Sequence, residues 1–377
     1  MKKRFLLTAA AGAMMLALAA CGSSSTATTT AAAAGTAAET TAAGTSAAGT
    51  AAETTAAGTE TTAAAGEASG TSALKESPKE KKETSWKPTT AVSIIVPAGA
   101  GGNTDLSARV FAQYAKKLSG TDFVVVNANG AAGSVAANQV KSAAPDGSTF
   151  LYGHNLINVA NVAGITDYNY TAFKLGPTFA KDPAQGLYVN SEKYKDLNAF
   201  IEAAKAAPGQ LKACTEVGAY TYYEILDFEK LAGIDLDLVD VGSNSDKITA
   251  MLSGQVDLMP GSYINTKDYI AAGQFTCIGV PTESRYDLIK DIPTLKEQGV
   301  DLVYPDCDFS FYFPAGTSDD VIAWYENIII DMEADPECQK AIEDVQMMPY
   351  YLNAADSEKN DEAYFNTFKS IADELAK

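Results

Sequence analysis

The chain has 377 residues, of which 46% are hydrophobic and 20% charged, and its formal net charge is −19 at pH 7. This length suffices for two folded domains with sizeable cores. The strong negative charge argues against nucleic acid as a partner and against electrostatic attachment to an anionic membrane surface.

Residues 1–20 have the pattern of a bacterial lipoprotein signal peptide. Lys2, Lys3 and Arg4 precede an apolar run that is too short to span a bilayer as a helix, and the run ends in Leu-Ala-Ala-Cys at Cys21. We therefore expect lipidation of Cys21, and removal of the three basic residues would change the net charge from −19 to −22. The alternative for Cys21 is an ordinary free or buried thiol.

Residues 21–85 are predicted to be the lipidated cysteine and a disordered tether. After Cys21 they consist mainly of Ala, Thr, Gly, Ser and Glu, and the segment 33–45 is repeated without change as 47–59. Such a composition cannot bury enough apolar surface to offset the entropy lost on ordering the chain. The tether would let a folded head move above a membrane.

The folded head begins with two strand–loop–helix units. Val92–Val96 is predicted to be a buried strand, residues 97–103 a glycine-rich loop, and residues 104–118 a helix capped by Thr104 or Asp105. Residues 123–126 then lead into a second glycine loop at 130–134 and another helix. Such loops leave N–H groups unpaired at a helix N-terminus, where the helix dipole attracts an anion. The alternative is that these glycines only permit tight turns.

Strands and helices alternate through the rest of the head. Residues 186–190 are predicted to be a strand, 196–207 a helix, and 318–333 an apolar helix; further strands are expected at 211–214, 236–241, 257–260, 275–280 and 306–313. This alternation predicts an α/β fold with doubly wound parallel sheets and a ligand outside the carboxyl ends of the strands. We expect a discontinuous first lobe of residues 86–190 and 308–377, and an inserted second lobe of residues 191–307.

A series of short motifs occurs along the chain after Trp86. They are Ile94-Ile95-Val96-Pro97, Gly101-Gly102-Asn103-Thr104-Asp105 with Ala108-Arg109, Asn127 with Gly130-Ala131-Ala132-Gly133-Ser134, Ala144-Pro145-Asp146-Gly147, Ala207-Pro208-Gly209, residues 252–258, residues 291–299, and Pro314-Ala315-Gly316-Thr317. In order and spacing they resemble the substrate-binding proteins of tripartite tricarboxylate transporters, the TctC or Bug-type family. The resemblance implies a two-lobed periplasmic-binding-protein-like (type II) fold that closes on a ligand in the cleft between its lobes.

The resemblance also implies that the two glycine loops bind the ligand. The predicted contacts are Ala98, Gly99, Ala100, Gly101, Gly102, Asn103, Thr104 and Asp105 in the first loop, and Gly130, Ala131, Ala132, Gly133 and Ser134 in the second. Asp105 either reaches the pocket or organises its loop, since it can also pair with Arg109 along one helical face. The second loop has Ala132 and Ser134 where glycine and asparagine are usual in the family, and the Ser134 hydroxyl keeps a polar group at the helix N-terminus.

Further predicted contacts follow other strands. They are His154 and Asn155 after a strand at 149–152, Gly218, Ala219, Tyr220 and Thr221 in a third loop, Gly242 and Ser243 in a fourth, and Tyr263 in a fifth. His154 is the single histidine of the chain and is either structural or a ligand contact. The tyrosines in these loops, together with Tyr222 and Tyr223, either line the pocket or pack at a domain face.

The chain has few groups that could clamp an anion or hold a metal. Its arginines are Arg4, Arg109 and Arg285, and Arg4 would leave with the signal peptide, so a cluster of guanidinium clamps is not available. We expect the anion to be held mainly by backbone N–H groups, hydroxyls and water. One histidine and the spacing of Cys214, Cys277, Cys307 and Cys338 indicate no metal site and no cofactor; these cysteines are either free or partly bridged.

The usual catalytic motifs do not occur. The chain has no Gly-x-Ser-x-Gly elbow and no Gly-Lys-Ser/Thr phosphate loop, and Thr104 replaces the last glycine of a Gly-x-Gly-x-x-Gly pattern. We expect no enzyme but a monomeric, lipid-anchored receptor at the outer face of the bacterial cytoplasmic membrane or in the periplasm. It would capture a small organic carboxylate and deliver it to integral-membrane transporter subunits. The alternatives are a ligand sensor for a membrane signalling kinase and an adhesive or structural surface protein.

Overall fold

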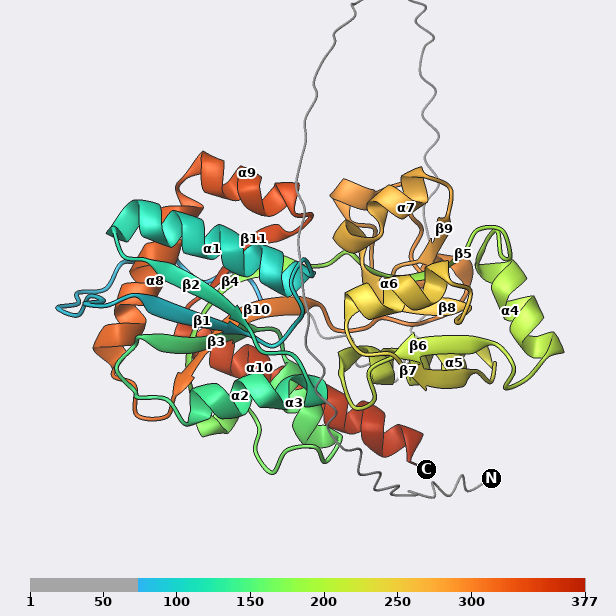
Figure 1. Ribbon diagram of the computed structural model, residues 1–377, viewed down its shortest axis with the longest axis horizontal. Helices are drawn as coiled ribbons and strands as arrows, with labels where there is room; N and C mark the ends of the chain where they lie inside the picture. The colour runs from blue at the N-terminus through green and yellow to red at the C-terminus, as the bar shows by residue number, and fades with distance from the viewer. Residues whose placement is uncertain (1–73, 377) are drawn as a thin grey trace, which may run out of the picture. The chain divides into compact units, whose positions relative to one another are not determined.

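The computed structural model describes residues 74–376 and shows an α/β fold with two mixed sheets (Figure 1). This confirms the predicted fold class. The predicted signal peptide, Cys21 and most of the predicted tether lie outside the described residues and stay predictions. Between residues 74 and 376, no helix combines the length and the apolar character needed to cross a membrane.

Residues 74–85, predicted to end the tether, pack instead against the first lobe. The Ser77 N–H donates to the Tyr351 carbonyl at 3.0 Å, and the Ser77 hydroxyl donates to Asp356 Oδ2 at 2.6 Å. Lys79 pairs with Glu333 at 2.9 Å. The composition changes here from Ala and Thr to Lys and Glu, and these lysines find partners on an acidic helix, so the ordered chain begins before Trp86.

The first sheet has six strands in the order β11-β4-β10-β3-β1-β2. Their bounds are β1 (Val92–Val96), β2 (Phe123–Asn127), β3 (Thr149–Gly153), β4 (Phe173–Asp182), β10 (Cys307–Pro314) and β11 (Met348–Leu352). Strand β1 pairs in parallel with β2 and β3, whereas β10 and β11 run antiparallel to their neighbours. The prediction of parallel sheets was therefore wrong for this half of the sheet, because the chain returning from the second lobe enters β10 from the opposite end.

Helices cover both faces of the first sheet (Figure 1). They are α1 (Asn103–Ser119), α2 (Ser134–Lys141), α3 (Leu156–Val162), α8 (Asp319–Glu333), α9 (Pro336–Asp344) and α10 (Ala354–Leu375). Alternate residues of β1 face opposite ways: Ile94 packs in the cluster that contains Phe111 of α1, and Ile95 packs in the cluster that contains Ala136 of α2. This alternation explains why β1 is buried on both faces.

The second sheet has five strands in the order β7-β6-β8-β5-β9. Its elements are β5 (Gln185–Asn190), α4 (Leu197–Ala206), β6 (Lys212–Thr215), α5 (Tyr220–Ala232), β7 (Asp237–Asp240), α6 (Asn244–Leu252), β8 (Leu258–Ser262), α7 (Lys267–Ala271) and β9 (Phe275–Gly279). Residues 186–190 were predicted to belong to the first lobe, but β5 pairs with β8 and β9 in this sheet. Strand β4, which the sequence did not predict, is the last strand of the first sheet before the chain crosses over, so the next strand starts the second sheet.

A buried carboxylate fixes the first crossover between the sheets. Asp182, the last residue of β4, is 0% exposed, and its Oδ2 accepts hydrogen bonds from Asn103 Nδ2, Gln185 Nε2 and Ser262 Oγ at 2.6 to 2.8 Å. Its Oδ1 accepts from the Ala184 N–H at 3.0 Å. Burial raises the pKa of Asp182 despite these donors. Asp182 thus connects the start of α1 to β5 and β8 of the other sheet.

The aromatic core of the first lobe gives a stability prediction. The Phe111 ring on α1 is 0% exposed and meets Phe123, Phe150, Phe179 and Phe311 edge to face, with centroids 4.7 to 6.1 Å apart. Phe111→Ala should lower the free energy of unfolding by about 4 kcal/mol, because it removes a buried ring and leaves a cavity. Urea unfolding of the purified protein measures this loss.

A matched control lies on the same helix. Leu118 is 41% exposed, so Leu118→Ala should change the free energy of unfolding by about 0.5 kcal/mol or less. Equal effects of the two substitutions would contradict the placement of the core.

Candidate functional site

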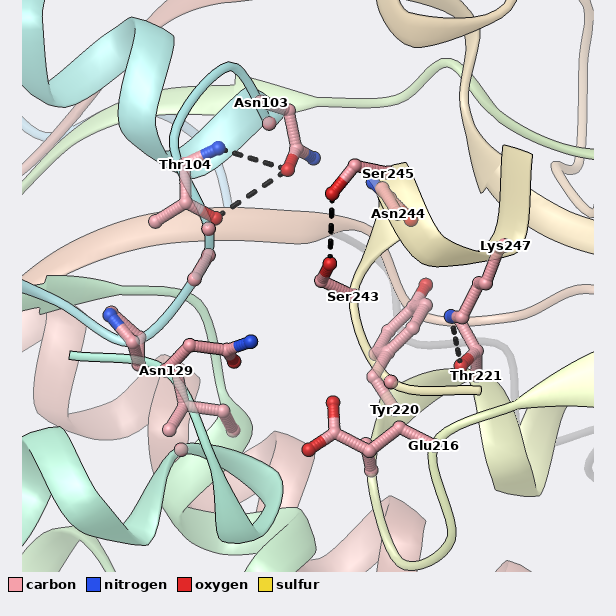
Figure 2. A pocket seen from close by; sticks show the side chains of 18 of the residues that line it. Asn103, Thr104, Asn129, Glu216, Tyr220, Thr221, Ser243, Asn244, Ser245 and Lys247 are labelled. Carbon is pink, nitrogen blue, oxygen red and sulfur yellow. Dashed lines mark hydrogen bonds between the residues drawn. The ribbon is translucent and has the colours of Figure 1, made fainter. Parts of the chain in front are cut away.

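A pocket of about 250 Å³ lies between loops that follow the strands of both sheets. From the first lobe it is lined by the loop between β1 and α1 and by residues after β2 and β3. From the second lobe it is lined by the loops after β6 and β7. Figure 2 shows Asn103, Thr104 and Asn129 on one side and Glu216, Tyr220 and Ser243 on the other. The carboxyl ends of strands therefore meet at this pocket, as expected for ligand sites in α/β sheets.

Most of the predicted contact residues line this pocket. They are Ala98, Gly99, Ala100, Gly101, Gly102, Asn103, Thr104, Ala132, Gly133, His154, Ala219, Tyr220, Thr221, Gly242 and Ser243. The predicted contacts that do not line it are Asp105, Gly130, Ala131, Ser134, Asn155, Gly218 and Tyr263. Among the clustered tyrosines only Tyr220 lines the pocket, and its hydroxyl donates to the Pro305 carbonyl at the second crossover.

Asp105 holds the first glycine loop from behind. Helix α1 begins at Asn103 with Gly102 as its N-cap, so the predicted capping by Thr104 or Asp105 was wrong. Instead Asp105 Oδ2 accepts from the Gly101 N–H and from Arg109 Nε, both at 2.9 Å, while Oδ1 accepts from Arg109 Nη2 at 2.9 Å and Asn127 Nδ2 at 3.0 Å. Of the two roles left open for Asp105, the structure shows the organising one.

This donor set controls the charge of Asp105. Burial alone would raise the pKa of Asp105, but hydrogen bonds from Arg109, the Gly101 N–H and Asn127, together with the Arg109 charge, bring it below its ordinary value. The carboxylate is therefore ionised at neutral pH. In the loop it holds, the N–H groups of Gly99 and Ala100 donate no hydrogen bond to a described residue, so they are available to an anion in the pocket.

The second glycine loop has a strained backbone. Ala131 and Ala132 have φ angles of 48° and 50°, in the left-handed region that costs a residue with a Cβ about 1 kcal/mol. The Ala132 N–H donates to Glu216 Oε1 at 2.9 Å. Since Glu216 follows β6 in the second lobe, this hydrogen bond crosses the pocket.

A second contact also joins the two sides. Asn265 Nδ2 donates to the Gly101 carbonyl at 2.9 Å. A Cβ built on Gly99 would lie 3.7 Å from the Ser243 hydroxyl oxygen. The loops of the two lobes are therefore in contact around the pocket, which is the arrangement of a closed binding protein.

The sequence analysis missed the cation of the site. Lys247 on α6 lines the pocket, is 4% exposed, and donates from Nζ to the Thr221 hydroxyl at 2.9 Å (Figure 2). Burial lowers the pKa of Lys247, and the nearby acidic groups, among them Glu216 and Glu224, partly oppose this. The residue was overlooked because only arginines were weighed, although its spacing from the buried Ala250 and Met251 places it on the inward face of α6.

His154 lies at the pocket as an uncharged group. Its Nδ1 is 3.0 Å from Asn155 Oδ1, and its ring meets Tyr220 and Phe309 edge to face. Burial lowers the pKa of His154, and Lys247 lowers it further. Among residues 74–376 no group of His, Cys, Asp or Glu could hold a metal ion, and Cys214, Cys277, Cys307 and Cys338 are free thiols.

Other lining residues were not among the predicted contacts. They are Pro97, Asn129, Leu156, Gln185, Asn244, Ser245, Ile248, Asn265 and Cys307, as well as Glu216 and Lys247. Asn244 and Ser245 belong to the segment that resembles the family's fourth loop, and Ile248 lies one helical turn further along α6.

A pocket enclosed by loops from two α/β lobes defines a two-lobed solute-binding protein. Within this class, residues 107–376 match the sequence model described as Tripartite tricarboxylate transporter family receptor. The protein therefore belongs to the tripartite tricarboxylate transporter receptor family, which confirms the resemblance drawn from its motifs. This is a family of substrate-binding receptors, not of enzymes.

Curated relatives agree with this assignment. The chain is 27% identical over 277 residues to the UPF0065 protein in gbd 5'region of Cupriavidus necator. This match covers 71% of the chain and 82% of that protein. It is 25% identical over 244 residues to Protein BugT of Bordetella pertussis, covering 62% of this chain and 74% of that protein.

Solved structures show the same fold. Periplasmic binding protein BugD has a TM-score of 0.70 at 22% identity and covers 77% of this chain and 99% of its own. MatC from Rhodopseudomonas palustris with bound malate has a TM-score of 0.69 at 22% identity, and the match covers 76% of this chain and 100% of MatC. A protein of R. palustris with adipate has a TM-score of 0.72 at 23% identity, and the match covers 77% of this chain and 98% of that protein.

The charge network at Asp105 predicts a pH-dependent contribution to stability. Because the folded state lowers the pKa of Asp105, its interactions stabilise the fold fully above the unfolded-state pKa of about 3.9 and are lost as pH falls through the lower folded pKa. Asp105→Asn should lower the free energy of unfolding by about 2 kcal/mol at neutral pH. The difference from wild type should shrink as the solution is acidified.

Urea titrations at a series of pH values measure this difference. Asp122→Asn is the control, because it removes a carboxylate whose side chain is 66% exposed. A deficit for Asp105→Asn that stayed constant through the acidic range would contradict the ionised network.

Proposed function

We propose that the protein is an extracytoplasmic solute receptor that captures a small organic carboxylate between its lobes and delivers it to a tripartite tricarboxylate-type membrane transporter. The observation that carries this proposal is the interlobe pocket, with N–H groups that donate to none of residues 74–376 on one wall and a buried lysine on the other. Among the described residues, no three His, Cys, Asp or Glu side chains lie close enough together to hold a metal ion.

The pocket offers two kinds of donor to a carboxylate. On the first lobe, the Gly99 and Ala100 N–H groups lie in the loop that Asp105 holds. On the second lobe, Lys247 has three donor hydrogens and one hydrogen-bond acceptor among the described residues, the Thr221 hydroxyl. An anion stabilises a buried ammonium that lacks hydrogen-bond acceptors. A ligand carboxylate between the loop and Lys247 would therefore accept hydrogen bonds from the donors of both lobes.

The remaining parts of the proposal follow from the family and the N-terminal sequence. The signal-peptide pattern and Cys21 support lipid anchoring at the outer face of the bacterial cytoplasmic membrane or in the periplasm. The family description supports transporter subunits as the partner that receives the solute. The solved neighbours with malate and with adipate support a carboxylate as the ligand class.

A thermal-shift screen of carboxylates against the purified protein tests the proposed function. A ligand that binds only the folded state raises the melting temperature with concentration, so at least one small carboxylate should do so. A broad carboxylate library that leaves the melting temperature unchanged would contradict the proposal.

Lys247 should carry a large share of the affinity for such a ligand. Lys247→Met keeps the length of the side chain but removes the ammonium, and it should weaken binding about 30-fold, which corresponds to about 2 kcal/mol for a charged hydrogen bond. Calorimetric titration measures the change. The control is Lys205→Met on α4, which removes an exposed lysine of the same lobe; equal effects of the two variants would remove Lys247 from the site.

A further inference from the structure

One anion-binding loop of the pocket already holds a carboxylate that belongs to the protein. Glu216 lies just after β6 in the second lobe and lines the pocket. Its Oε1 accepts the Ala132 N–H of the opposite lobe at 2.9 Å. The second oxygen, Oε2, accepts no hydrogen bond from a described residue. Figure 2 shows the Glu216 carboxylate pointing into the open part of the pocket.

The loop that receives Glu216 is shaped for an acceptor. Two consecutive residues with a Cβ, Ala131 and Ala132, adopt left-handed backbone conformations there, and Gly133 follows with a φ of 86°. Strained backbone of this kind persists where it serves a function. Here the strained turn directs the Ala132 N–H at a carboxylate from the other lobe, so Glu216 occupies a donor of the loop that was predicted to bind the ligand.

The charge of the pocket lining is balanced. Lys247 supplies a positive charge and Glu216 a negative one. His154 is uncharged because burial lowers its pKa, and Cys307 stays a thiol because burial raises its pKa. One ligand carboxylate can therefore pair with Lys247, whereas a second carboxylate would find Glu216 and no second positively charged side chain in the lining. A second ligand carboxylate would share a cavity of about 250 Å³ with Glu216, so the two like charges would lie close together and repel each other.

We propose that Glu216 is a specificity-determining residue that makes this receptor select small carboxylates with a single negative charge over dicarboxylates. The inference rests on the proposed function. In the closed form Glu216 accepts a hydrogen bond from the second glycine loop and so joins the lobes. The ligand carboxylate binds the first loop and Lys247, and the far end of the ligand meets Glu216 Oε2. An amide or hydroxyl there can donate a hydrogen bond to Oε2, whereas a carboxylate is repelled.

Matched pairs of ligands that differ by one charge test this inference. The probes are succinate with succinamate and adipate with its monoamide, titrated calorimetrically at neutral pH. The wild-type protein should bind each monoamide about tenfold more tightly than the corresponding dicarboxylate, the effect of one like charge at short range. Glu216→Gln keeps an oxygen acceptor for the Ala132 N–H but removes the charge, so it should reduce this ratio to about threefold or less by tightening dicarboxylate binding.

Glu202→Gln is the control, because Glu202 is exposed on α4 and its substitution removes the same charge far from the pocket. It should leave the ratio unchanged. Wild-type protein that binds succinate as tightly as succinamate, or an unchanged ratio in Glu216→Gln, would overturn the inference and leave carboxylate capture intact. Failure of all four probes to bind either folded protein would overturn the inference, and the thermal-shift screen of the broad carboxylate library then decides the proposed function.

Discussion

The site depends on the way in which Asp105 holds the loop between β1 and α1. One buried carboxylate accepts the Gly101 N–H and pairs with Arg109 and Asn127, so its own acceptor capacity is used on the side of the loop away from the pocket. The N–H groups of Gly99 and Ala100 remain for a ligand. A fixed loop loses little entropy when an anion binds, and preorganisation of this kind improves affinity without additional contacts.

The two lobes contribute groups of opposite character to the pocket. The first lobe offers backbone donors from glycine-rich turns, and the second offers the side chains of Glu216 and Lys247. Glu216 reaches back to the first lobe and closes the pocket through Ala132, while Asp182 joins the sheets at the first crossover. The sequence predicted that backbone N–H groups, hydroxyls and water would mainly hold the anion, and it did not predict that Lys247 lines the pocket. The pocket lining thus contains both main-chain donors and one buried lysine.

Local patterns in the sequence predicted the parts of the fold that local interactions determine. The loop after Val96, the start of α8 after its N-cap Ser318 and the strand that became β7 all lie within a few residues of their predicted places, because turn residues, caps and apolar runs act over short distances. Strands β4 and β11 were missed and β5 was assigned to the wrong lobe, because their pairing is set by long-range antiparallel contacts. The hydrogen bond from Ala132 to Glu216 joins residues far apart in sequence, and no short-range pattern reports it.

Backbone amide chemical shifts of the first loop test the central claim most directly. In 15N-labelled protein, saturation with a carboxylate that binds by calorimetry should shift the amide signals of Gly99 and Ala100, because their N–H groups gain a charged acceptor. Binding heat accompanied by unchanged signals for both residues would contradict the account, since the carboxylate would then be held elsewhere.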